Sequence, residues 1–313
     1  MRTAVVGVGY LGNFHAQKYK ALSSGENPLC QFVAVCDLNA NQATKVATEL
    51  GVKAVTKPQE LIGMVDAVSI ATITPTHFEL AKLFLENGIH VNVEKPICLK
   101  TSDAEELVQL ADKKNLTLCV GHSERFNPAY QELCKSVKNP QFVEFNRYAP
   151  FKLRGSDVSA LHDLMIHDID LMLSMDSSPY KLISAQAGKM VTKSYDWCSA
   201  SFQFESGMAC QINCSRLAKE MVRAVRAIDQ QAIWIANLQT GDLEKTFAVD
   251  HPEHPVGVSV VNVGRGDNLM TETEAFLKAI NKTRGGPAAV SGRDGMKALQ
   301  VVDKIIAHLG SSN

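Results

Sequence analysis

Two short stretches of the sequence hold residue types that could stabilise a charge and move a proton. In the first, GIHVNVEKPICLK, Glu94 and Lys95 end an alternating apolar run and Pro96 follows them. Charged side chains are rarely buried at a strand end without a partner or a task. The Lys95 ammonium could hydrogen-bond a reacting hydroxyl and stabilise the developing alkoxide charge, and Glu94 could orient or neutralise that ammonium.

The second stretch, DLMIHDIDLMLSM, places Asp163, His167 and Asp170 at helical spacing. Positions i, i+4 and i+7 lie on one face of a helix, so these side chains would form a polar stripe among apolar ones. Histidine is suited to accept a proton near neutral pH, and Asp163 could hold His167 in the correct tautomer. Asp168 lies off this face, and we expect it to face solvent or to cap the helix. A lone histidine is more often a core residue, but the carboxylates on its face favour a catalytic role. We predict no metal site, because no tight His/Cys ligand pair is present.

A glycine-rich turn near the start predicts a dinucleotide site. In VVGVGYLGNFHA, Gly7, Gly9 and Gly12 have G-x-G-x-x-G spacing after a strand and at the start of a helix. This arrangement permits a tight turn, close approach of a pyrophosphate and close helix packing. Asp37 ends the next predicted strand, and no arginine follows it directly, so we predict NAD rather than NADP. The residues expected to contact the cofactor are Gly7, Gly9, Tyr10, Leu11, Gly12, Asp37, Thr72, Glu94 and Lys95.

The elements that must position these residues change in kind along the chain. Strand-like and helix-like segments alternate up to Gly121, which predicts βαβ units and a parallel sheet. Beyond it, alternating segments indicate a C-terminal α+β domain on a largely antiparallel open sheet, with closing helices at roughly 268–281 and 292–309. We predict an N-terminal Rossmann domain over 1–121 and a substrate and oligomerisation domain over 122–313. Helix caps are expected at Thr101 or Ser102 and at Ser291 with Asp294.

Composition excludes several classes of protein. The 313 residues carry a formal net charge of -1, so no broad field attracts nucleic acid or a membrane. The sequence contains no run of 18 apolar residues, so we predict no membrane span. The eight cysteines form no Cys-x-x-Cys pair, and we read them as reduced thiols of a cytoplasmic protein.

Together, the motifs resemble those of the glucose–fructose oxidoreductase / inositol dehydrogenase (Gfo/Idh/MocA) family across nearly the whole chain. The matching segments are VGVGYLG, IATITPTHFELA, GIHVNVEKPICL and DLMIHDID. The resemblance implies hydride transfer between a nicotinamide and a sugar or polyol carbon, and assembly into dimers or tetramers through the open sheet. It also implies that Lys95 is the active-site lysine, that His167 is the general base, and that Asp163 binds or orients substrate. His15 and His77 match family positions as well, and we interpret them as packing or capping residues.

Within the family, CVGHSERFNPAY, RYAPFKLR and DLMIHDIDL most resemble nucleotide-sugar 3-dehydrogenases of the UDP-N-acetylglucosamine type. His122, Arg125 and Asn127 are then expected to contact substrate, and Arg147 and Arg154 to bind its diphosphate. A structural role for Arg125 and a solvated basic face for the other arginines stay open. The alternatives are a dehydrogenase of a free sugar, inositol or other polyol, and a non-catalytic NAD-sensing protein.

Overall fold

The structure is a computed structural model that describes residues 1–153, 158–282 and 288–311. Contacts divide the chain into two units, which are described separately. The first unit is formed by Met1–Ser123 and Asn268–Leu299, and the second by Glu124–Asp267 and Gln300–Asn313. The predicted boundary between residues 121 and 122 differs from this division, because the segment 268–299 returns to the first unit.

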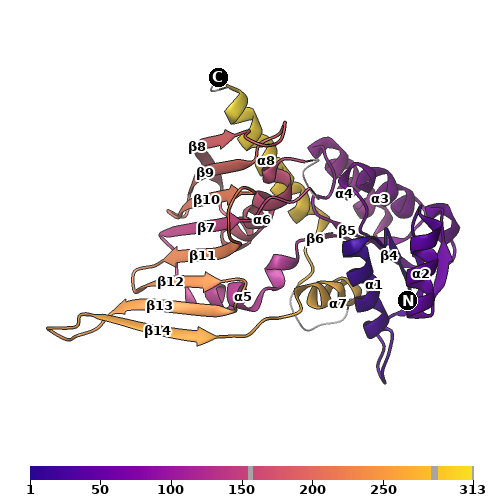
Figure 1. The fold of residues 1–313 in the computed structure, drawn as a ribbon, viewed down its shortest axis with the longest axis horizontal. Helices are drawn as coiled ribbons and strands as arrows, with labels where there is room; N and C mark the ends of the chain where they lie inside the picture. Colours follow the sequence, from indigo (N-terminus) through magenta and orange to yellow (C-terminus); the bar gives the residue numbers. More distant parts are fainter. Residues whose placement is uncertain (154–157, 283–287, 312–313) are drawn as a thin grey trace. The chain divides into compact units, whose positions relative to one another are not determined.

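The first unit is built on a parallel sheet of six strands in the order β3-β2-β1-β4-β5-β6, drawn in indigo and purple in Figure 1. This is the strand order of a dinucleotide-binding Rossmann sheet. The strands consist of β1 Arg2–Val6, β2 Gln31–Cys36, β3 Lys53–Val55, β4 Ala67–Ile70, β5 His90–Glu94 and β6 Leu118–Gly121. Their side chains are largely buried, as expected where helices cover both faces of a parallel sheet.

Among the described residues, six α-helices contribute to this unit. They are α1 Tyr10–Leu22, α2 Ala40–Leu50, α3 His77–Glu86, α4 Thr101–Lys114, α7 Asn268–Ile280 and the first part of α8 Gly292–Ser311. The predicted cap of α8 is confirmed, since Ser291 and Asp294 exchange side-chain to backbone hydrogen bonds. The predicted cap of α4 is wrong: Lys100 precedes the helix and no side chain caps it.

The second unit is built on a sheet of eight strands in the order β14-β13-β12-β11-β7-β10-β9-β8. Only β7 and β10 pair in parallel, so the prediction of a largely antiparallel sheet is confirmed. The strands consist of β7 Phe142–Tyr148, β8 Tyr180–Gly188, β9 Trp197–Phe204, β10 Ala209–Ser215, β11 Val222–Ile228, β12 Ala232–Asn237, β13 Asp242–Ala248 and β14 Val256–Asn262.

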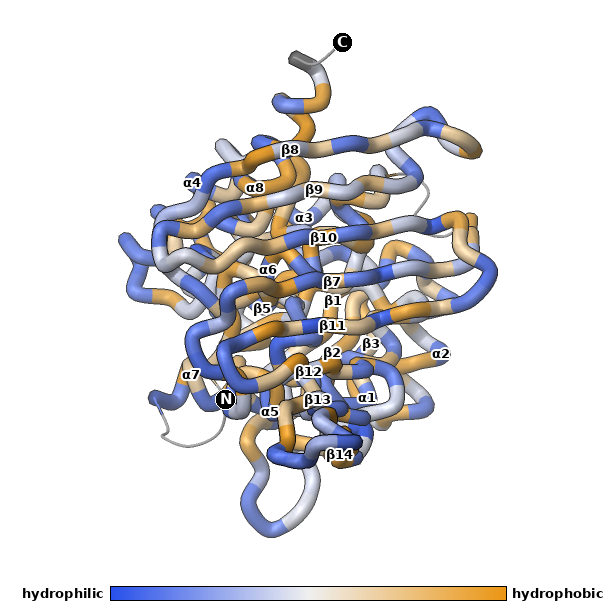
Figure 2. The backbone as a smooth tube through the Cα atoms, turned by 90° about the vertical axis from the view of Figure 1, so that its left-hand side faces the viewer, coloured by the Kyte–Doolittle hydropathy of each residue, from blue (hydrophilic) through white to orange (hydrophobic). Residues whose placement is uncertain are grey.

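Helices cover one face of this second sheet. These are α5 Pro128–Ser136 and α6 Ile166–Met175, which a π-helical turn, Leu161–Met165, precedes. Phe145, Val225 and Ile212 lie in register on the covered face and are fully buried. Figure 2 looks onto the opposite, open face. Within the described ranges, no helix is long and apolar enough to cross a membrane.

Candidate active site

The cofactor residues predicted in the first unit gather at one edge of its sheet. Asp37, Gly7, Thr72 and Lys95 follow β2, β1, β4 and β5, which are neighbours in that order. Because all strands are parallel, their carboxyl ends meet at this edge. Ligands of open α/β sheets bind there, at the point where the strand order reverses between β1 and β4.

The glycine turn leaves room for an anion at the start of α1. Gly7 has φ +81°, and a Cβ on Gly12 would meet the carbonyl oxygen of Gly7 at 1.7 Å, so neither position accepts a side chain without strain. A Cβ on Gly9 would point into open space. Gly9 is also the N-cap of α1 and no side chain caps that terminus. The turn therefore fits a pyrophosphate at a helix N-terminus.

Asp37 is held rigidly beside this turn. Its Oδ2 accepts the backbone N–H of Val8 at 2.9 Å, and its Oδ1 accepts that of Asn39 at 2.9 Å. The exposed residue Leu38 and the helix cap Asn39 follow it, and neither carries a positive charge. A carboxylate held here can accept ribose hydroxyls and would repel a 2′-phosphate. Of the other expected contacts, Tyr10 is 71% exposed and Leu11 is half-buried.

Buried groups anchor the loop that carries Lys95. Glu94 Oε2 accepts the backbone N–H of Lys95 at 3.2 Å, and its Oε1 accepts Nε2 of His15 at 2.8 Å. The next peptide bond, Lys95–Pro96, is cis. His77 lies against the carbonyl oxygens of Pro96 at 2.9 Å and Thr72 at 3.2 Å. Burial lowers the pKa of His77 although both carbonyls raise it, so the ring is neutral at neutral pH and donates to one of them.

In the second unit, Asp163 and His167 lie on the segment that enters α6. Asp163 belongs to the π-helical turn and His167 to the first turn of α6, and both side chains are half-buried. π-helical turns occur frequently at functional sites. The expectation that Asp168 faces solvent is wrong: its side chain is buried, because it pairs with an arginine.

That arginine is Arg147, which was expected to bind a diphosphate. Its Nε and Nη2 donate to Asp168 at 2.9 and 2.7 Å, and Nη1 donates to Glu124 at 3.4 Å. Burial lowers the pKa of Arg147, but the charges of Asp168 and Glu124 raise it by more, so the net shift is upward. Glu124 also accepts Arg223 Nη1 at 3.1 Å. Arg147 is only 3% exposed, so it takes part in a buried ion-pair network within the second unit, and its role as a diphosphate ligand stays a prediction.

Two further predicted substrate residues take part in contacts inside the second unit. Arg125 forms a bidentate pair with buried Asp170, with both N···O distances 2.7 Å. Asn127 caps α5 through the N–H of Ala129 and donates to the carbonyl of Leu238 at 2.8 Å. These hydrogen bonds give Asn127 a structural function at the start of α5. One fifth of the Arg125 side chain is exposed, so its pairing does not remove it from a substrate surface.

The remaining predicted residues are placed as follows. His122 directly follows β6 and is buried. Arg154 lies outside the described residues. Sequence reasoning missed Glu272, a buried carboxyl on α7 that lies close to His15 and Glu94. Its position near the C-terminus gave no signal that it would return to the first unit.

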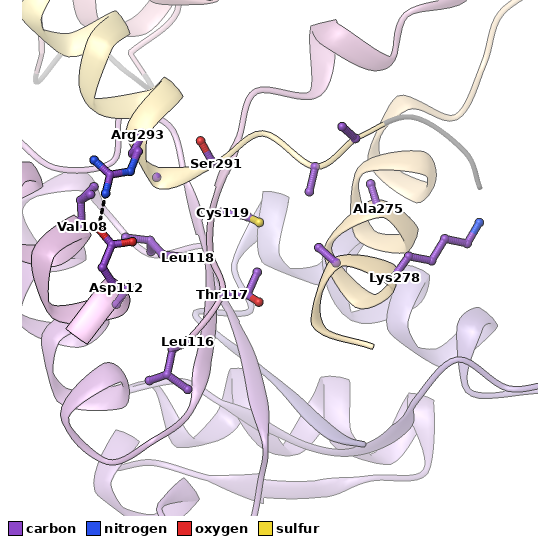
Figure 3. Close-up of a pocket in the computed structure, with 15 residues that line it drawn as sticks. Val108, Asp112, Leu116, Thr117, Leu118, Cys119, Ala275, Lys278, Ser291 and Arg293 are labelled. Atoms are coloured by element: carbon purple, nitrogen blue, oxygen red, sulfur yellow. Dashed lines mark hydrogen bonds and ion pairs between the residues drawn. The ribbon is translucent and has the colours of Figure 1, made fainter. Parts of the chain in front are cut away.

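A cavity of about 520 Å³ lies elsewhere in the first unit (Figure 3). Its wall includes the start of β6 around Leu118, the α7 residue Lys278, and Arg293, which pairs with Asp112. None of the predicted site residues lines it. The cavity is therefore no part of the predicted cofactor site.

Comparison with known proteins agrees with this geometry. Residues 1–122 match the model of an oxidoreductase family with an NAD-binding Rossmann fold, and residues 142–232 match the GFO/IDH/MocA C-terminal domain. UDP-N-acetylglucosamine 3-dehydrogenase of Acidithiobacillus ferrooxidans is 36% identical over 307 residues, which are 96% of this chain and 94% of that protein. Myo-inositol 2-dehydrogenase of Thermotoga maritima is 28% identical over 96% of this chain and 93% of that protein.

Solved structures show the same fold. A structure of the Acidithiobacillus ferrooxidans enzyme superposes with a TM-score of 0.88 at 34% identity, over 99% of this chain and 98% of that chain. Levoglucosan dehydrogenase in complex with NADH and levoglucosan superposes with a TM-score of 0.87 over 100% of this chain and 98% of that chain. At 18% identity that likeness concerns the fold alone. The sequence matches and the glycine turn together establish that the chain belongs to the Gfo/Idh/MocA family of NAD-dependent oxidoreductases.

Proposed function

We propose that this chain oxidises a hydroxyl of a nucleotide sugar reversibly, with NAD as the hydride acceptor, and that Lys95, His167 and Asp163 are the catalytic residues. One observation supports the assignment of Lys95 above all. It follows β5 at the sheet edge where the glycine turn follows β1, and only β4 lies between these strands. A lysine that directly follows a strand at this edge can reach a dinucleotide bound there.

The proposed chemistry divides between two side chains. The Lys95 ammonium hydrogen-bonds the reacting oxygen and stabilises its developing negative charge. His167 accepts the hydroxyl proton, and Asp163 orients the imidazole. When bound, NAD supplies the acceptor for the hydride that leaves the same carbon. The products are a carbonyl compound, NADH and one proton held by His167.

The proposed cofactor is NAD rather than NADP. The support is the Asp37 carboxylate, fixed by two backbone N–H groups, and the lack of a cation at the next two positions. The proposed cofactor contacts are those of the turn, Gly7, Gly9, Tyr10, Leu11 and Gly12, with Asp37, Thr72, Glu94 and Lys95. Glu94 is proposed to act through Lys95, because its two carboxylate oxygens already accept hydrogen bonds from His15 and from the backbone.

The proposed substrate is a UDP-N-acetylglucosamine-like sugar oxidised at its 3-hydroxyl. The support is the 36% identity to the enzyme of that name over nearly the full length of both chains. His122 and Arg125 are the proposed substrate contacts. One observation favours a free sugar or polyol instead: Arg147, a predicted diphosphate ligand, is occupied by buried carboxylates.

The test is NADH formation with a panel of UDP-sugars, free hexoses and inositols, using the wild type and Lys95→Ala. Turnover of UDP-N-acetylglucosamine alone supports the nucleotide-sugar assignment. Turnover of a free polyol alone would keep the proposed catalytic residues and replace the proposed substrate. Lys95→Ala should lower kcat by about 100-fold or more and change the Kd for NAD by less than about three-fold. Equal losses of both would mean that Lys95 acts through cofactor binding alone and has no catalytic role. NAD binding without any turnover would favour a non-catalytic NAD-sensing protein.

We also propose a homo-dimer or homo-tetramer formed through the open face of the second sheet. Val256, Val258 and Val260 of β14 are each about 60% exposed, and Val258 and Val260 share that face with Ile233 and Ile235 through β13. β14 also pairs with β13 alone, which makes it an edge strand. Exposed apolar edge strands are aggregation-prone unless another surface covers them.

A further inference from the structure

A buried polar cluster lies behind Lys95 in the first unit. It consists of His15 on α1, Asn92 and Glu94 on β5, and Glu272 on α7, each at most 8% exposed. Carboxyl groups are almost never buried this deeply unless they are paired. Two carboxyls in one cluster with a single histidine therefore need a physical explanation.

The two carboxyl groups have different partners. Glu94 accepts hydrogen bonds from His15 at 2.8 Å and from the backbone N–H of Lys95 at 3.2 Å. Glu272 Oε1 accepts only Asn92 Nδ2, at 3.2 Å, and Glu272 Oε2 has no hydrogen-bond partner. Among the described residues, no lysine, arginine or histidine forms an ion pair with Glu272.

These environments separate the protonation states of the two groups. Burial raises the pKa of Glu272 and the neighbouring Glu94 charge raises it further, which outweighs the hydrogen bond from Asn92. Burial also acts to raise the pKa of Glu94, but the hydrogen bond and charge of His15, and the charge of Lys95, bring it below its ordinary value. A pair of carboxyls separated in this way holds one proton and one negative charge near neutral pH.

A metal ion is the other species that could satisfy such a cluster. One ligand atom from each of His15, Glu94 and Glu272 lies within 4.8 Å of the others. A carboxylate can only accept, so the 2.8 Å contact places a proton on His15 Nε2, directed at Glu94. A metal ion at this nitrogen would have to displace that proton, so the metal content of the purified protein separates the two states.

We propose that Glu272 is a positioning residue for Lys95: it stays a neutral carboxylic acid, so that Glu94 is the one anion of the cluster and holds the Lys95 backbone. This inference rests on the proposed catalytic role of Lys95. The titratable and polar groups that face Glu272 are His15 and Tyr19 of α1, Asn92 and Glu94 of β5, and Cys119 of β6. A second negative charge in this cluster would compete with Glu94 for His15 and weaken the bond to the Lys95 N–H.

The first test is thermal unfolding as a function of pH, which requires no substrate. The folded wild type keeps a proton on Glu272 that the unfolded chain releases above its ordinary pKa of 4.5. Its stability should therefore fall as pH rises from there toward the folded-state pKa. Glu272→Gln carries no such proton, so the Tm difference between variant and wild type should grow in the variant's favour from pH 6 to pH 9. Glu274→Gln, which removes a partly exposed carboxylate of α7 that pairs with Lys278, should follow the pH dependence of the wild type. Equal pH dependence in all three proteins overturns the proposal.

The second test separates positioning from packing. Glu272→Gln should keep kcat near neutral pH within about two-fold and lose less activity than the wild type at alkaline pH. Glu272→Ala should lower kcat by about ten-fold or more while the Kd for NADH changes by less than about three-fold. A Glu272→Gln enzyme as impaired as Glu272→Ala, or one stoichiometric divalent metal per wild-type chain that is lost in Glu272→Gln, overturns it. If no substrate is turned over, the proposed function fails, while the Tm profile still tests the protonation of Glu272.

Discussion

His15 Nε2 lies 2.8 Å from Glu94 Oε1, and this contact joins the helix that starts at the glycine turn to the residue preceding Lys95. Both side chains are buried, so the contact is shielded from solvent. Gly121 packs against this carboxylate, because a Cβ there would come within 3.1 Å of the Glu94 oxygens and the Glu94 side chain would have to shift slightly. The glycine turn and Lys95 therefore share one buried support.

His15→Ala should destabilise the protein by about 3 kcal/mol at pH 7, because it leaves a buried carboxylate short of a donor. Burial raises the pKa of Glu94, but the hydrogen bond and charge of His15 lower it by more, so the pKa lies below its ordinary value of 4.5 in the fold. The stabilising contribution of Glu94 is therefore present above pH 4.5 and is lost as pH falls below it. The difference in unfolding free energy between His15→Ala and the wild type should therefore be nearly constant from pH 7 to pH 5 and shrink as pH falls below 4.5. Urea unfolding at pH 7, 5 and 3.5 measures it. Gln17→Ala, exposed on the same helix, is the control, and a difference that grows on acidification would contradict the assignment.

Much of the fold could be predicted because it depends on local patterns. The alternation of buried strands and helices up to Gly121 predicted the parallel sheet. β13 and β14 could not be predicted in this way. Their side chains are mostly half-buried or exposed, so no clean alternation marks them, and β14 is held by its pairing with β13.

The parts of the candidate site that lie within one local sequence motif could be predicted. The turn, Asp37 and Lys95 each follow a strand whose end is visible in the sequence. The ion pairs of Arg147 could not be predicted, because its partners, Asp168 and Glu124, come from other elements and become neighbours only in the folded second unit. Glu272 was missed for the same reason, since 180 residues separate it from Asn92.

Asp37→Asn should relax the preference for NAD over NADP by about ten-fold in kcat/KM. The substitution removes the charge that repels a 2′-phosphate but keeps an acceptor for the N–H of Val8 or Asn39. The measurement is kcat/KM with each cofactor. Asn41→Asp adds a negative charge in the exposed first turn of α2. It tests whether a carboxylate near Asp37, rather than at its position, also disfavours NADP. An unchanged cofactor ratio in Asp37→Asn would show that Asp37 only shapes the turn.

Arg147→Ala should lower the free energy of unfolding by about 3–5 kcal/mol, because it leaves Asp168 and Glu124 as buried charges. The measurement is denaturant unfolding together with KM for the substrate. Arg223→Ala removes a half-exposed partner of the same Glu124 and should cost less than about 1 kcal/mol. The double variant Arg147→Met/Asp168→Leu should recover part of the loss. A raised KM with unchanged stability in Arg147→Lys would instead restore Arg147 as a substrate ligand.

Val258→Lys/Val260→Lys should convert the proposed oligomer to a smaller species. Direct cross-strand partners share a face of a sheet, so Val260 lies beside Glu244 and Ile235 on the open face, two residues from Val258. Two lysines there would have to bury positive charges in an apolar contact, and the cost of desolvating them exceeds the free energy gained by the apolar contact. Light scattering after size-exclusion chromatography measures the mass. Val261→Lys is the matched control, because Val261 has similar exposure on the same strand but points to the other face. If Val261→Lys dissociates the oligomer and the double variant does not, the contact lies on the opposite face of β14.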